Sequence, residues 1–113
     1  MPPFPEGAGM VIDAVSQSTG AERTVVVEPA PAGVVLVIRE KDAELARVEV
    51  PADKLLTVLT ERPAGPQVVV AIDKKVLEVE VRRNEVLLTA WKADAAVGLD
   101  DLMDALAEAI PSD

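Results

Sequence analysis

The chain carries one succession of strand-like runs twice, and this recurrence limits its fold more than any local motif. A shift of 43 residues places Thr24–Pro29 on Gln67–Ile72, and the apolar run Val34–Ile38 on Leu77–Val81. The breaks between runs coincide as well, since each copy reads apolar, turn, apolar, turn, apolar, and then a segment of helical period. We interpret the chain as an internal duplication. The alternative is that valine-rich runs recur by chance.

Each copy predicts three strands followed by a helix. In the second copy, Leu77–Val81 alternates apolar and polar residues, as in a strand with one solvated face. Arg83-Asn84 then predicts a tight turn into a returning strand. The first helix is expected from Pro51 to about Glu61. The second is expected to carry one apolar stripe that ends at Pro111 and consists of Leu99, Leu102, Met103, Leu106 and Ile110.

The predicted fold class is therefore α+β, a tandem duplication of a βββα unit with antiparallel sheets and two amphipathic helices. We assign residues 24–113 to a single globular domain made of two repeats, 24–62 and 67–111. Residues 1–23 are rich in proline and glycine and predict a flexible leader. Within the leader, Met10–Val15 is expected to form a short strand or a helical turn.

The residue types that are missing exclude several kinds of chemistry. The 113 residues contain no histidine, cysteine or tyrosine. This excludes zinc-finger and iron–sulfur ligation, thiol chemistry and nucleophiles activated by histidine. We therefore expect no enzyme activity, no metal and no cofactor. The lack of cysteine fits a reducing compartment, so we expect the protein in the cytoplasm. No membrane association is expected, because no apolar run approaches the ~18 residues of a membrane span.

The charge and the apolar strands predict a module that binds proteins, including itself. A net charge of -9 disfavours phosphate backbones and suits a basic protein partner. Val34–Ile38 has no polar face, Val25–Val27 and Val68–Val70 are equally apolar, and two short helices cannot cover so many strands. We therefore expect a homo-oligomer, most economically a dimer, with Val35 and Val37 in its contact surface.

A family resemblance supplies an alternative function. Val34–Glu40, followed by Arg47–Leu59, resembles the strand–strand–helix end of the positive-cofactor-four transcriptional coactivators. The doubled, strand-rich arrangement is similar to that of the Whirly proteins, which bind single-stranded nucleic acid on a curved antiparallel sheet. The resemblance implies that the chain is a single-stranded nucleic-acid-binding protein, similar to a transcription cofactor.

Basic residues near equivalent hairpin tips are the candidate nucleic-acid contacts. They are Arg39 and Lys41 in the first copy and Arg82 and Arg83 in the second, with Trp91 as the strand-borne residue for base stacking. The chain departs from both families in its acidity and in its lack of strand aromatics. We therefore consider nucleic-acid binding a less favoured function than protein binding. Basic residues at turns have another explanation, since they also keep strand edges soluble.

Overall fold

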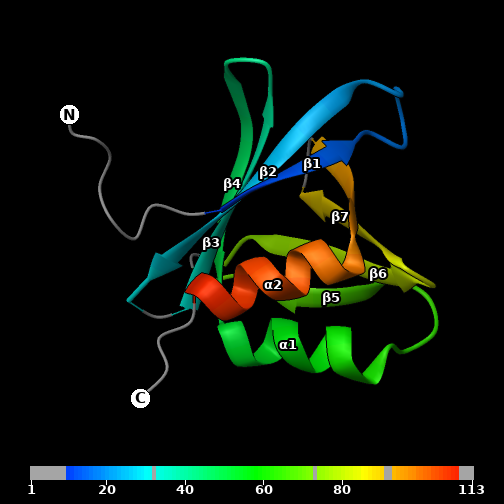
Figure 1. Cartoon of the computed structure of the whole chain (residues 1–113). Helices are drawn as coiled ribbons and strands as arrows, with labels where there is room; N and C mark the ends of the chain where they lie inside the picture. The colour runs from blue at the N-terminus through cyan, green and yellow to red at the C-terminus, as the bar shows by residue number, and fades with distance from the viewer. Residues whose placement is uncertain (1–9, 32, 73, 91–92, 110–113) are drawn as a thin grey trace.

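The computed structural model describes residues 10–31, 33–72, 74–90 and 93–109, and these form eight strands and two helices (Figure 1). Each half of the chain gives four strands and then a helix. The first half contains β1 (Met10–Val15), β2 (Glu22–Ala30), β3 (Gly33–Glu40), β4 (Ala43–Val50) and α1 (Ala52–Glu61). The second half contains β5 (Gln67–Val70), β6 (Val76–Arg82), β7 (Glu85–Ala90), β8 (Ala93–Gly98) and α2 (Leu99–Ala109).

All the strands belong to one antiparallel sheet of order β4-β3-β2-β1-β8-β7-β6-β5. The two halves join through β1 and β8, and this join is a single residue pair, Val15 with Ala96. At the far edges of the sheet, the backbone N–H of Ile72, just after β5, donates to the carbonyl of Glu49 in β4 at 2.7 Å. The sheet therefore curls until its two edge strands meet, which makes a nearly closed barrel.

We call these two joins the β1–β8 seam and the β4–β5 seam. Each seam connects the end of the first strand of one half to the last strand of the other half. Strand order alone thus makes the two halves equivalent around the barrel, with β3 as the counterpart of β7 and β4 as the counterpart of β8.

One hydrophobic core fills the inward side of the curled sheet. Alternate strand residues point into it, as Val34, Leu36 and Ile38 do on β3, each at most 2% exposed. The two helices contact each other and cover this side, with Leu55 and Leu59 from α1 and Leu102 and Leu106 from α2 in the same core. Full burial of such a leucine is worth about 1.5–3 kcal/mol, so the helices are held by packing.

The helix α1 begins and ends close to the predicted positions. Pro51 is the N-cap of α1, and the backbone N–H of Arg62, in a left-handed conformation, donates to the Val58 carbonyl at 2.9 Å and ends the helix. On α2 the predicted apolar stripe is confirmed for the described residues Leu99, Leu102, Met103 and Leu106, while Ile110 and Pro111 lie outside the described residues. No helix in the described part of the chain is long and apolar enough to cross a membrane.

The predicted α+β duplication of a βββα unit is wrong. The chain is rich in β-structure, and four strands, not three, precede each helix. One additional strand is β1, the Met10–Val15 segment of the expected leader 1–23, for which a short strand or a helical turn was expected; it is a strand and pairs with β2 along its whole length. Residues 1–9 lie outside the described residues. The other additional strand is β8, which was missed. The 43-residue shift therefore compared β3 with β6, although the counterpart of β3 in the sheet is β7.

Candidate functional site

Exposed apolar side chains gather at the edge of the sheet formed by β5. Among the described residues seven large hydrophobic side chains are exposed, and four of them lie at this edge. Val68 is 61% exposed and Val70 is 58% exposed on β5, Ile72 follows the strand, and Val76 begins β6. In the ladder between the two strands, Val70 lies opposite Val76. We call these four residues the β5 strip.

The strip arises because β5 is apolar on both faces. Val69 points inward and is 3% exposed, in one core with Leu77, whereas its neighbours Val68 and Val70 point outward. In the ladder Val68 lies opposite the exposed Glu78. An apolar patch that remains exposed at a sheet edge is a candidate surface for association.

Charged residues of both signs border the β5 strip. Lys74 and Lys75 lie in the turn between β5 and β6, and Glu78 lies further along β6. A hollow of about 270 Å³ opens beside Val76 and is lined by Val48, Lys75, Val76, Glu78 and Thr89. The surface is therefore an apolar centre with a mixed rim, which is the usual anatomy of a protein–protein contact.

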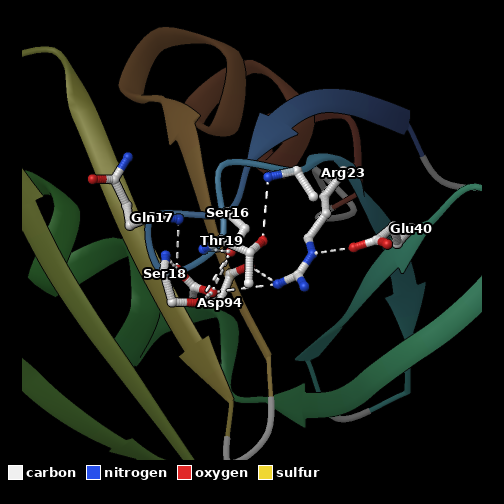
Figure 2. Close-up of polar contacts among 8 residues, drawn as sticks. Ser16, Gln17, Ser18, Thr19, Arg23, Glu40 and Asp94 are labelled. Atoms are coloured by element: carbon white, nitrogen blue, oxygen red, sulfur yellow. Dashed lines mark hydrogen bonds and ion pairs between the residues drawn. The ribbon is translucent and has the colours of Figure 1, made fainter.

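A cluster of polar side chains lies at the β1–β8 seam and centres on Asp94 (Figure 2). The Asp94 carboxylate accepts hydrogen bonds from the hydroxyls of Ser16 at 2.8 Å and Ser18 at 2.9 Å, and from the backbone N–H groups of Gln17 at 2.7 Å and Ser18 at 3.2 Å. Arg23 donates to the Asp94 carbonyl at 2.8 Å, and its Nε lies 3.0 Å from Glu40. We call this arrangement the Asp94 clasp.

The clasp holds Asp94 in its charged form. Burial raises the pKa of Asp94, but hydrogen bonds from Ser16, Ser18 and Gln17 together lower it by more, so the pKa lies below its usual value. A carboxylate with a lowered pKa is a poor general base, and the chain has no histidine to activate Ser16. Ser16 is 1% exposed, and the hydrogen bonds to Asp94 connect the two halves of the sheet at this seam.

The basic residues expected to contact nucleic acid are divided between opposite ends of the sheet. Arg39 and Lys41 lie at the turn between β3 and β4, at the end where β1 turns into β2. Arg82 and Arg83 lie at the turn between β6 and β7, at the end where β8 passes into α2. In an antiparallel sheet these two turns leave in opposite directions. Trp91 lies outside the described residues.

Three of the four basic residues also take part in local contacts. A guanidinium nitrogen of Arg39 donates to the Asp42 carbonyl at 3.1 Å, and one of Arg82 lies 3.3 Å from a Glu80 carboxylate oxygen. The carbonyl of Arg83 accepts a hydrogen bond from Arg62. The structure therefore gathers the four residues into no common surface.

The predicted self-association residues Val35 and Val37 are less accessible than the β5 strip. Val37 lies on the outer face of β3 yet is 1% exposed, and Val35 is half-buried. The three apolar runs expected to need a cover are Val25–Val27, Val34–Ile38 and Val68–Val70. Only in Val68–Val70 are two side chains more than half exposed to solvent. The sequence shows that this run is apolar, but no pattern in it predicts that its strand lies at the edge of the sheet.

Comparison with protein-family models, with curated proteins and with solved structures finds no match for this chain. The resemblance to the positive-cofactor-four and Whirly proteins therefore stays a prediction from the sequence.

Proposed function

We propose that this protein is a non-catalytic assembly module that binds a second copy of itself through the β5 strip. The observation that carries the proposal is the joint exposure of Val68, Val70, Ile72 and Val76 at one edge of the sheet. The cytoplasm as the place of action belongs to the proposal and rests on the sequence alone.

Burial of the β5 strip favours dimerisation, but it does not by itself give a stable dimer. Its side chains are roughly half exposed, so burying the remainder contributes on the order of 1 kcal/mol for each one. Two strips in contact would then contribute about 8 kcal/mol. Association costs about 4–15 kcal/mol in lost motion, so apolar burial alone supports at most a weak dimer. A stable dimer needs further contacts next to the strip.

The rim of the strip favours a second copy over a basic partner. Lys74 and Glu78 border the same apolar surface, so two strips related by a twofold axis present opposite charges to each other. The net charge of -9 on each copy opposes association at long range. Salt screens this repulsion, and we therefore expect the dimer to strengthen with added salt.

Sedimentation equilibrium at micromolar concentration tests the proposal. The wild-type chain is expected to be a dimer, and Val68→Lys/Val70→Lys a folded monomer. Val11→Lys is the matched control, because Val11 is 64% exposed on the outer face of β1, away from the strip. A wild-type monomer, or a dimer that Val11→Lys disrupts as effectively as the double variant, would contradict the proposal.

A further inference from the structure

We infer that the β5 strands of two copies pair directly, antiparallel and in a register centred on Val69, which joins the two eight-stranded sheets into one. This inference rests on the proposed self-association. It supplies the contacts that the β5 strip needs beyond apolar burial, because paired edge strands exchange backbone hydrogen bonds.

The backbone of β5 has donors and acceptors directed away from β6. In an antiparallel pair, alternate residues direct their N–H and C=O groups toward the partner strand. The N–H of Ala71 donates to the Lys75 carbonyl at 2.7 Å, so the odd-numbered residues face β6. The N–H of Ile72 donates at 2.7 Å in the other direction, to Glu49 of β4. By the same alternation, the N–H and C=O of Val68 and Val70 face the edge of the sheet.

Among the described strands β5 has a pairing ladder with β6 alone, and its other edge, toward which those groups point, meets β4 at the β4–β5 seam. The pairing ladder of β5 covers Gln67 to Val70, and the contact with β4 comes only after it, at Ile72. A second β5 strand that approaches this edge meets two residues whose backbone groups are oriented to receive it.

The register follows from the residues on either side of β5. A twofold axis at Val68 would pair Val70 with Pro66, which has no N–H to donate. An axis at Val70 would pair Val68 with Ile72, whose N–H is already donated to Glu49. Each of these two registers leaves an edge-facing carbonyl of β5 without a donor. An axis at Val69 pairs Val68 of each copy with Val70 of the other, so that every edge-facing N–H and C=O group of these residues finds a partner.

The same register matches the side chains. Val68 and Val70 both point outward, so the paired strands place four valines side by side on one outer face. Val76 continues this apolar row beyond Val70, and Glu78 ends it beyond Val68. Because the strands run antiparallel, the Lys74 turn of one copy lies at the end of the contact where the other copy carries Glu78. The contact thus combines an apolar row with complementary hydrogen bonding and charge.

Cysteine variants measure the register directly, because the chain has no cysteine of its own. In the Val69-centred register, Val68→Cys/Val70→Cys places each introduced thiol opposite the other position in the second copy. Opposed strand residues have Cα atoms about 5.5 Å apart, which suits a disulfide. Positions 68 and 70 of one copy are separated by about 6.8 Å along the strand and point in parallel, so they do not bridge.

Under mild oxidation of the native dimer, we expect the double variant to form a covalent dimer at least tenfold faster than Val68→Cys, Val70→Cys or the control Val11→Cys. Peptide mapping is expected to find the bond between position 68 and position 70. Fastest cross-linking of Val68→Cys alone would indicate an axis at Val68, and that of Val70→Cys an axis at Val70. Either result overturns the register.

Sedimentation of the unmodified chain separates the two proposals. A wild-type dimer that cross-links in another register, or through position 11, overturns the β5 pairing and leaves self-association standing. A wild-type monomer overturns both. Hydrogen exchange gives a second readout, because the Val68 and Val70 amides are expected to exchange at least tenfold more slowly when the protein is concentrated. The Val69 amide faces β6 already and is expected to show no such change; slowing of all three, or of none, would contradict the pairing.

Discussion

The Ser16 hydroxyl donates to Asp94 Oδ1 at 2.8 Å and so connects two residues that are 78 positions apart in the chain. The strands on either side share only the Val15–Ala96 pair at this seam. The Asp94 clasp therefore supplies most of the hydrogen bonds that hold the first half of the sheet to the second at this end.

Replacing Asp94→Asn is expected to destabilise the protein by about 1–3 kcal/mol, because the amide keeps the shape but loses the charge that four donors and Arg23 face. Urea unfolding measures the loss. Asp13→Asn is the matched control, since Asp13 is an exposed carboxylate on β1 with no role in the clasp. Equal losses in the two variants would show that the clasp does not hold the seam.

The clasp also predicts how stability depends on pH. The pKa of Asp94 is lowered in the folded protein, so its contribution is present above the usual aspartate value of 3.8 and disappears as the pH falls through the lower, folded-state value. Between about pH 5 and pH 2, wild type should lose more stability than Asp94→Asn. Urea midpoints across this range test it, and parallel curves for the two proteins would count against the lowered pKa.

Gly33 at the start of β3 is expected to tolerate no side chain. A Cβ atom on Gly33 would lie 2.0 Å from the backbone oxygen of Val50, and a backbone atom in a paired strand cannot move aside. Gly33→Ala should cost about 3 kcal/mol or more by thermal unfolding. Gly98→Ala is the control, because its Cβ would meet only the flexible Asp101 side chain at 3.1 Å. Similar melting temperatures for both variants would refute the expectation.

Single-stranded oligonucleotides are expected not to bind at physiological salt. The candidate contacts Arg39 and Lys41 lie at one end of the sheet and Arg82 and Arg83 at the other, on a chain of net charge -9. Fluorescence anisotropy with labelled DNA and RNA tests this. A salt-dependent rise in anisotropy that Arg82→Glu/Arg83→Glu abolishes would restore the nucleic-acid function.

Local sequence patterns predicted the elements that a strong periodicity defines. The alternation over Leu77–Val81, the turn at Arg83-Asn84 and the helix after Pro51 all appear in the structure where the sequence placed them. Two strands were predicted less well, since Met10–Val15 was left open between a strand and a helical turn and β8 was missed. β1 follows a proline- and glycine-rich stretch, and Ala93–Gly98 is rich in alanine, which packs well inside a tight barrel but has no strong preference for strands.

The candidate site depends on relationships that no local pattern contains. The sequence marked Val68–Val70 as apolar, but the exposure of Val68 and Val70 follows from the position of β5 at the edge of the sheet. The sequence could not predict the hydrogen bonds of Ser16 and Ser18, because these residues lie in a polar loop and their partner, Asp94, lies far away in the sequence on the last strand. The 43-residue shift aligned β3 with β6 and not with β7, its counterpart in the sheet. Valine-rich runs resemble one another, so they align well whichever two strands are compared.

The two seams also determine the order in which strand contacts can form while the chain is synthesised. Every hairpin within a half links neighbours along the chain, whereas the β1–β8 seam cannot close before Asp94 and Ala96 have been synthesised. Local pairings form early and distant ones late. We therefore expect the first four strands to form an open sheet during translation, with unpaired edges at both β1 and β4 until the second half of the chain emerges. In that interval the nascent chain is expected to be most exposed to aggregation.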